Sequence, residues 1–281
     1  MNIAEALALC TAQLSEHDVP DARRDAVLLV AFATGRDRTY LIAHPETSLT
    51  PDQTATLSEI TARRSLREPL QYITGRQEFY KLEFEVTPDV LIPRPETEIL
   101  VERAITVLSA IEAPRFCEIG VGSGCISISV LHELKNASAA ACDISENAIA
   151  IARRNAEKHG VSNRLRLIVS DLFDSVPDEA FDTILSNPPY VPEVDFDSLQ
   201  TEVRDYEPTI ALTSGADGLT VIERLIRQAP EHLRPGGVLL FEMGFNQSGK
   251  VSEMLDETVW TDIDVLPDLQ GIPRILYALK R

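Results

Sequence analysis

The sequence of 281 residues predicts an α/β protein with an open sheet of about seven strands, preceded by a small helical domain. From about residue 96 onward, short apolar runs that end in glycine-, acid- or proline-containing turns alternate with helix-like segments. The first 75 residues instead show apolar residues at helical spacing. With 44% apolar residues, the chain is long enough to bury the cores of two domains.

The N-terminal domain, residues 1–75, is predicted to be a bundle of four or five helices. Ile3, Ala6, Cys10 and Leu14 lie on one face of a first helix, together with Leu7, and residues 22–32 form a second. A capping box at residues 50–53, with proline at the first helical position, begins a later helix that ends near residue 66. Two roles stay open for this bundle, a structural lid and a substrate-docking domain.

Residues 76–95 are expected to form a β-hairpin linker between the domains. Leu82, Phe84 and Val86 alternate with polar residues, a turn is predicted at residues 88–89, and Val90 and Ile92 continue the pattern. Residues 96–281 then form the second domain.

The second domain begins with a strand, a glycine turn and a helix. The apolar run at 116–119 leads into the turn at 120–124, and a helix-like stretch follows at 125–131. Glycines in such a turn let a ligand approach the backbone closely. The turn reads G-x-G-x-G followed by Cys125, which differs from the dinucleotide fingerprint with glycine at its sixth position.

Two further predicted strands end in acidic residues. Residues 137–142 lead to Asp143, which is placed to accept the two hydroxyls of a ribose. Residues 165–169 lead to Asp171 and Leu172, where an adenine would lie between polar and apolar groups. Either acid could instead be a helix cap or a solvated residue.

The fourth predicted strand, residues 181–186, is followed by Asn187, Pro188, Pro189 and Tyr190. Ligands of open α/β sheets bind at the carboxyl ends of the strands. Because proline has no backbone N–H, this loop offers carbonyl oxygens and the Asn187 amide without competing donors. A planar NH2 group could donate to the Asn187 side-chain oxygen and to the Pro188 carbonyl, which leaves its lone pair facing an electrophile. A rigid turn after a strand is the simpler alternative.

The order of these strand ends predicts a cofactor. The glycine turn, Asp143 and the 171–172 tip would hold a methionine moiety, a ribose and an adenine, and the loop at 187–190 would hold a methyl acceptor. We therefore expect S-adenosylmethionine. Three more strands, at 238–242, 259–265 and 275–279, bring the sheet to about seven.

The chain resembles the HemK/PrmC-type peptide chain release factor N5-glutamine methyltransferases. The segments that carry the resemblance span most of the chain: Arg63-Arg64, Glu68-Pro69, Tyr72-Ile73-x-Gly75, Glu78-Phe79, residues 91–98 (LIPRPETE), Glu118-x-Gly-x-Gly-Ser-Gly124, Asp143-Ile-Ser145, Asn187-Pro-Pro-Tyr190, Glu202-Val-Arg204, Glu207-Pro208, Asp217-Gly-Leu219 and Glu242-x-Gly244. The 91–98 segment together with Asn-Pro-Pro-Tyr is far more specific than either alone.

The resemblance implies a Rossmann-like class I SAM-dependent methyltransferase fold. It also implies methylation of the side-chain amide nitrogen of the glutamine in the Gly-Gly-Gln motif of release factors, which affects translation termination. The implied cofactor-binding residues are Gly120, Val121, Gly122, Ser123, Gly124, Asp143, Asp171, Leu172 and Asn187. Asn187, Pro188 and Tyr190 are the expected catalytic residues, and with Pro189 they would bind the substrate.

Several points depart from the family pattern or stay open. Leu172 stands where relatives can carry an aromatic residue, and Pro273 where an acidic residue is frequent. Arg94, Glu96 and Thr97 could close over the cofactor, or Arg94 and Glu96 could form a structural ion pair.

Charge and composition narrow the possible partners. The net charge is −18, and residues 76–281 hold 34 acidic against 19 basic residues. Nucleic-acid binding draws its affinity from Lys and Arg, so direct nucleic-acid binding is not expected; the charge suits solubility or a protein partner with basic patches. The sequence has neither an apolar run of about 18 residues nor a signal-peptide pattern, which predicts a cytoplasmic enzyme without membrane attachment. We expect a monomer.

The four cysteines, at 10, 117, 125 and 142, lack C-x-x-C spacing and are expected to be free thiols, with no metal site. Three alternative functions stay open. They are glutamine methylation of a ribosomal protein, N6-adenine methylation of DNA by base flipping, and a SAM-binding scaffold without catalysis.

Overall fold

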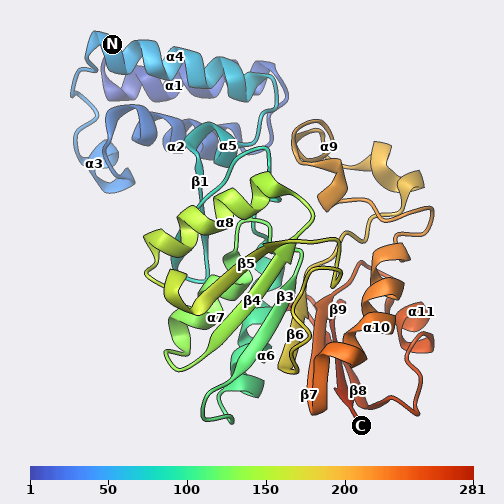
Figure 1. Cartoon of the computed structure of the whole chain (residues 1–281). Coiled ribbons are helices and arrows are strands. Elements are labelled where there is room, and N and C mark those ends of the chain that lie inside the picture. Colours follow the sequence, from blue (N-terminus) through green and yellow to red (C-terminus); the bar gives the residue numbers. More distant parts are fainter. The chain divides into compact units, whose positions relative to one another are not determined.

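The computed structural model describes residues 1–281 and divides into two compact units (Figure 1). The helical unit comprises Met1–Arg76 together with Gln200–Tyr206, a segment that is distant in sequence. The sheet unit comprises Gln77–Leu199 and Glu207–Arg281. No helix is long and apolar enough to cross a membrane.

The helical unit is a bundle whose apolar faces pack on one core. Its helices are α1 (Ile3–Glu16), α2 (Ala22–Thr34), α3 (Arg38–Ala43), α4 (Pro51–Ser65), α5 (Leu70–Thr74) and the remote α9 (Thr201–Tyr206). The predicted stripe of α1 is confirmed, since Ile3, Ala6, Cys10 and Leu14 are buried. The predicted capping box is present as well: Thr50 Oγ1 accepts from the backbone N–H of Gln53, and Gln53 Oε1 accepts from that of Thr50.

Helix α9 is held in the helical unit by ion pairs. Arg64 pairs with Glu202 at 3.0 Å and with Asp25 at 2.7 Å, and Arg67 pairs with Glu202 at 2.7 Å. Burial alone would raise the pKa of Glu202, but hydrogen bonds from Arg67 and Arg64 lower it to about 2. The unit therefore contains a segment that follows the Asn-Pro-Pro-Tyr loop in the chain by only ten residues.

The β-hairpin is present, but its predicted turn was wrong. The strands are β1 (Arg76–Phe79) and β2 (Leu82–Glu85), and the turn lies at Tyr80 and Lys81, whose φ angles are 47° and 63°. Two positive φ angles are usually signalled by Asn-Gly, which is absent here. At the predicted turn, the Val90 N–H does bond the Thr87 carbonyl, but no strand follows.

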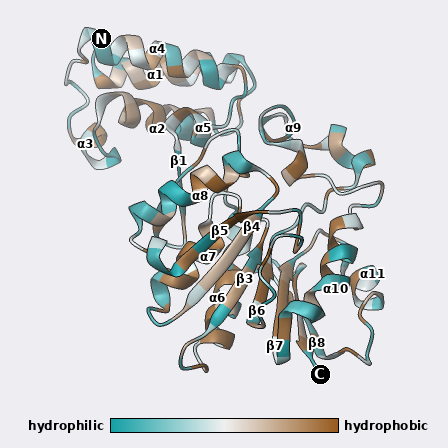
Figure 2. Cartoon of the chain, in the orientation of Figure 1, coloured by the Kyte–Doolittle hydropathy of each residue, from teal (hydrophilic) through white to brown (hydrophobic).

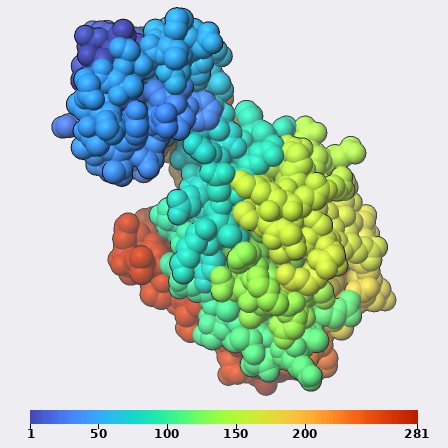
Figure 3. Space-filling view, turned by 90° about the vertical axis from the view of Figure 1, so that its left-hand side faces the viewer, coloured from blue at the N-terminus to red at the C-terminus, as the bar shows by residue number.

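The hairpin packs on α8 (Glu146–Lys158), within the sheet unit. Arg154 forms an ion pair with Glu85 at 2.7 Å, and the Phe84 ring lies 5.1 Å from that of His159, just beyond the helix. In Figure 3 the hairpin, in teal, lies beside the yellow-green surface of α8.

The predicted seven-stranded sheet is confirmed, with the order β5-β4-β3-β6-β7-β9-β8. β9 alone runs opposite to the direction that the other six strands share. The strands are β3 (Arg115–Ile119), β4 (Ser138–Asp143), β5 (Leu165–Val169), β6 (Phe181–Ser186), β7 (Leu233–Glu242), β8 (Trp260–Pro267) and β9 (Pro273–Lys280). β7 is brown over most of its length in Figure 2, in agreement with the burial of its last six residues, 237–242.

Helices cover both faces of the sheet, because alternate strand residues point to opposite sides. Phe116 belongs to the core shared with α6 (Glu98–Leu108), α7 (Cys125–Glu133) and α8. Its neighbour Cys117 belongs to the core shared with α10 (Thr220–His232) and α11 (Ser248–Glu253). From β3 the chain continues to β4 on one side and later to β6 on the other, so the carboxyl ends of β3 and β6 form a switch point where ligands bind in such sheets.

Candidate functional site

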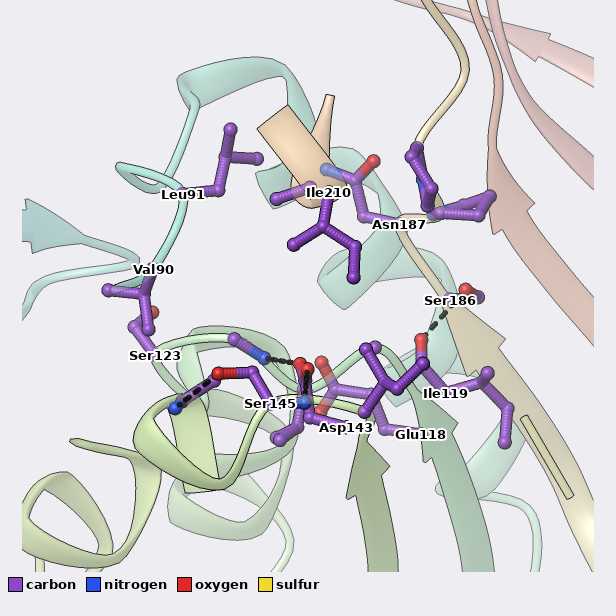
Figure 4. A pocket seen from close by; sticks show the side chains of 18 of the residues that line it. Val90, Leu91, Glu118, Ile119, Ser123, Asp143, Ser145, Ser186, Asn187 and Ile210 are labelled. Carbon is purple, nitrogen blue, oxygen red and sulfur yellow. Dashed lines mark hydrogen bonds between the residues drawn. The ribbon is translucent and has the colours of Figure 1, made fainter. Parts of the chain in front are cut away.

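A cavity of about 260 Å³ lies at this switch point, within the sheet unit. Its walls come from the loops after β3, β4, β5 and β6, from the segment between β2 and α6, and from residues 208–211. Figure 4 shows Leu91, Ile210 and Asn187 on one side of the cavity, opposite Glu118 and Asp143.

The glycine turn forms the floor of the cavity. Gly120, Gly122 and Gly124 have φ angles of 76°, 53° and 83°, a region that glycine adopts without strain. Gly120, Val121, Gly122 and Ser123 line the cavity. Gly124 does not; it precedes α7, and a Cβ atom there would lie 2.7 Å from Ile128 Cδ1. Close packing against Ile128 therefore explains the glycine at position 124.

Asp143, at the end of β4, ties the glycine turn to the next helix. Its Oδ2 accepts the Gly122 N–H and its Oδ1 accepts the Ser145 N–H, both at 2.9 Å. Burial raises the pKa of Asp143, against the opposing effect of these hydrogen bonds. Each oxygen retains a second lone pair, so the carboxylate can still accept a ligand hydroxyl.

Glu118 lines the cavity and is fully buried in β3. Its Oε2 accepts the Ser127 N–H at 2.9 Å, whereas its Oε1 has no hydrogen-bond partner. Burial raises the pKa of Glu118 to about 8. A buried carboxyl oxygen without a partner is costly unless a donor or cation reaches it. Glu118 belongs to one of the motifs that carry the family resemblance but was not among the expected site residues; the available signal was one acid inside an otherwise apolar strand.

The third strand end also lies at the cavity. Asp171 and Leu172 line it, and Asp171 pairs with Arg224 at 3.0 Å. Leu172 is 7% exposed with a φ angle of 48°. It therefore presents a fixed apolar surface beside a charged pair, as expected for an adenine site.

The loop after β6 brings Asn187, Pro188 and Pro189 to the cavity. Asn187 Nδ2 donates to Thr97 Oγ1 at 3.1 Å, and Thr97 Oγ1 donates to Glu242 Oε2 at 2.6 Å. Tyr190 does not line the cavity, and its hydroxyl donates to Glu242 Oε1 at 3.1 Å. Burial raises the pKa values of both Glu242 and Tyr190.

Glycines support the far end of this loop. A Cβ atom on Gly218 would lie 2.1 Å from the Tyr190 carbonyl oxygen, and one on Gly244 would lie 2.8 Å from Gln247 Oε1. Gln247 Nε2 donates to the Tyr190 carbonyl at 2.9 Å. The close approach of the Tyr190 backbone explains the glycine in the 217–219 motif, and the close approach of the Gln247 side chain explains the last glycine of the 242–244 motif.

Arg94 lines the cavity, but the ion pair considered between Arg94 and Glu96 was wrong. Arg94 pairs with Glu207 Oε1 at 2.5 Å, and Glu207 Oε2 accepts the Ile92 N–H at 3.2 Å. Burial raises the pKa of Glu207, opposed by the Arg94 guanidinium. Arg94 thus joins the segment before α6 to residues 208–211 of the cavity wall.

The strand order, with its single antiparallel strand, and the cavity at the carboxyl ends of β3, β4 and β6 identify the sheet unit as a class I methyltransferase, whose cofactor is S-adenosylmethionine. Residues 97–202 match the family model described as Methyltransferase small domain, and residues 5–75 match the PrmC N-terminal domain. The chain belongs to the release factor glutamine methyltransferase family.

Curated relatives support this assignment, and solved structures share the fold. The chain is 43% identical to the release factor glutamine methyltransferase of Geobacter sulfurreducens, over 94% of this chain and 91% of that protein. It is 41% identical to that of Koribacter versatilis, over 100% and 99%. A methyltransferase from Pyrococcus furiosus has a TM-score of 0.52 at 19% identity, covering 78% of this chain and 98% of that one. The hMettl16 catalytic domain has a TM-score of 0.59 at 16% identity, covering 78% and 81%. These two structures share the fold.

The residues of the cavity fit S-adenosylmethionine. The unpartnered Glu118 Oε1 is the acceptor that the ammonium group of its methionine part requires. A Cβ atom on Gly122 would meet nothing within 4 Å, so the turn leaves open space at the cavity. Asp143 retains lone pairs for hydroxyls, and Leu172 offers an apolar surface.

Proposed function

We propose that this chain methylates the side-chain amide nitrogen of the glutamine in the Gly-Gly-Gln motif of a peptide chain release factor. The observation that carries the proposal is the Asn187 amide at the cavity, with its nitrogen already bonded to Thr97. The Asn187 Oδ1 atom is therefore available for an incoming N–H group. The relatives, which are named release factor glutamine methyltransferases, support the choice of substrate.

The chain's own residues act by positioning. S-adenosylmethionine supplies an electrophilic methyl group on its sulfonium. An amide nitrogen is a poor nucleophile because its lone pair is delocalised, so orientation must contribute much of the rate, up to several kcal/mol. Asn187 Oδ1 and the Pro188 carbonyl would accept the two N–H groups of the glutamine amide. Both oxygens then stabilise the positive charge that develops on the nitrogen as it gains the methyl group.

Proton transfer does not require a strong base in this arrangement. The methylated nitrogen is acidic while it carries positive charge, so its surplus proton can leave to water. Tyr190 is not suited to act as the base, because its hydroxyl proton is donated to Glu242 and its pKa is raised by burial. Its ring would instead pack beside the stem of the glutamine.

We further propose that the helical unit docks the protein substrate. A groove runs between α1, α2 and α3, where Leu28 is 41% and Ile42 is 70% exposed. Arg23, Arg24 and Arg38 line the same groove and outnumber its two acids, Asp18 and Asp21, in a chain of net charge −18. An apolar groove with basic residues is suited to a protein segment that carries apolar and acidic side chains.

The substrate is tested by incubating the protein with labelled S-adenosylmethionine and separate pools of release factor, ribosomal protein and DNA. We expect the labelled methyl group to be incorporated into the release factor at a rate far above that in the other pools. Label only in ribosomal protein or only in DNA would refute it in favour of the corresponding substrate. Cofactor binding without label in any pool would indicate a scaffold.

A further inference from the structure

Four side chains from three segments form one hydrogen-bonded chain beside the cavity. Asn187 Nδ2 donates to Thr97 Oγ1 at 3.1 Å, Thr97 donates to Glu242 at 2.6 Å, and Tyr190 donates to the other oxygen of Glu242 at 3.1 Å. Thr97 and Glu242 are each only 2% exposed. Water therefore has little access to replace either partner.

With Glu242 ionised, the form that the hydrogen bonds from Thr97 and Tyr190 favour against the effect of burial, the direction of each hydrogen bond follows from proton counting. An ionised carboxylate only accepts, and a threonine hydroxyl has a single proton. The Thr97 proton is used for Glu242, so the Thr97 oxygen can only accept from its remaining neighbour, Asn187. A neighbour that donates must present Nδ2 and not Oδ1. The amide of Asn187 is thus held in one of its two orientations.

The second oxygen of Glu242 strengthens this arrangement. The Tyr190 hydroxyl occupies it, so both carboxylate oxygens have a donor. If Glu242 were uncharged, the Thr97 hydroxyl could donate its proton to Asn187 Oδ1. The flipped orientation of the amide would then be hydrogen-bonded as well. The carboxylate therefore sets the direction of every bond in the chain.

We propose that Thr97 and Glu242 are positioning residues that hold Asn187 with Oδ1 toward the substrate, so that the site selects a side chain that donates N–H over one that only accepts. This inference rests on the proposed function, because it takes glutamine as the substrate. It predicts discrimination between glutamine and glutamate, whose side chains have nearly the same shape. A site built around one polar partner discriminates strongly against an analogue that leaves it unpaired.

The test compares Thr97→Val with Thr97→Ser. Valine keeps the shape and removes the hydroxyl, whereas serine keeps the hydroxyl. Thr183→Val is the matched control, because Thr183 is also buried in the sheet unit but its Oγ1 has no hydrogen-bond partner. Each variant is first compared with the unaltered protein by thermal unfolding.

The first readout is discrimination between two peptides. The inhibition constant of a Gly-Gly-Glu peptide is divided by the Michaelis constant of the Gly-Gly-Gln peptide. We expect this ratio to fall at least about tenfold in Thr97→Val, which corresponds to one hydrogen bond, and to be preserved in Thr97→Ser and Thr183→Val. Repulsion of glutamate by Glu242 is common to all four proteins and cancels in the comparison. An unchanged ratio in Thr97→Val would overturn the inference.

The second readout needs no turnover. In the free protein, the side-chain NH2 signals of Asn187, assigned by their loss in Asn187→Asp, should exchange with water several times faster in Thr97→Val than in Thr97→Ser. Equal exchange would overturn the inference even if activity fell. If no glutamine substrate is methylated but the exchange rates differ, the proposed function fails and the orientation of Asn187 stands. Should Thr97→Val not fold, Glu242→Gln is measured by the exchange readout alone, because loss of its charge would also remove repulsion of glutamate; faster exchange of the Asn187 NH2 signals is expected, and unchanged exchange would overturn the inference.

Discussion

Binding of S-adenosylmethionine should release a proton from Glu118. In the free protein this carboxyl is fully buried, one of its oxygens has no partner, and burial raises its pKa to about 8. Below that pH the group is mostly protonated. An ammonium group placed against the free oxygen favours the charged form and lowers the pKa.

The size of the effect follows from the pKa. With a free-state pKa of about 8, about 0.9 of the Glu118 carboxyls carry a proton at pH 7 and about 0.1 at pH 9. If Glu118 is ionised throughout in the bound state, it releases about 0.9 proton at pH 7 and about 0.1 at pH 9. At pH 9 the net release is lower still, because the ligand's amine must gain a proton to bind as ammonium. Because the proton comes from a Glu118 carboxyl whose pKa is raised to about 8 in the free protein, the number of protons released must decrease as the pH rises through 8.

Isothermal titration calorimetry in buffers of different ionisation enthalpy measures this number directly. Glu118→Gln should abolish most of the release, while Thr183→Val should leave it unchanged. 5′-Methylthioadenosine, which lacks the amino-acid part, should bind with little proton release. Proton release that is near zero at pH 7, or equal in the Glu118→Gln variant, would refute the role assigned to Glu118.

Three further predictions concern the site and the helical unit. Asn187→Ala should lower turnover by roughly 10²–10³-fold with cofactor affinity largely kept, as for loss of one preorganised polar group; near-normal methyl transfer would contradict its role. Asp143→Ala should weaken cofactor binding by about 1.5–3 kcal/mol, and calorimetry showing unchanged affinity would count against the ribose assignment. Reversing the charge of Arg24 and Arg38 should raise the Michaelis constant for an intact release factor but not for a short Gly-Gly-Gln peptide, because contacts the peptide never makes cannot be lost. Equal impairment of both substrates, or of neither, would favour a structural lid.

Elements with a strong local signal could be predicted from the sequence. The strand before Asn187 is a six-residue run of which every residue is buried, and it ends in prolines that cannot continue a sheet. The helix that begins at Pro51 has its capping box and its N-terminal proline within four residues. In both cases the residues that determine the element are neighbours in the chain.

Features that depend on distant residues could not be predicted. Glu202 pairs with Arg67, 135 positions away, and nothing local to α9 indicates that it joins the helical unit. The unpartnered oxygen of Glu118 is a property of its packed surroundings. The position of the hairpin turn was predicted wrongly for another reason. Tyr80 and Lys81 adopt positive φ angles, which the surrounding strands impose against the ordinary preference of these residues.

We propose that the Asn187 loop directs methylation to the amide nitrogen of one glutamine. Fragmentation mass spectrometry of an intact release factor, after incubation with the protein and isotope-labelled S-adenosylmethionine, tests this directly. We expect a single labelled methyl group on the side-chain nitrogen of the Gly-Gly-Gln glutamine, and its loss in Asn187→Ala. A methyl group on any other residue, or the same label with the Asn187→Ala protein, would contradict it.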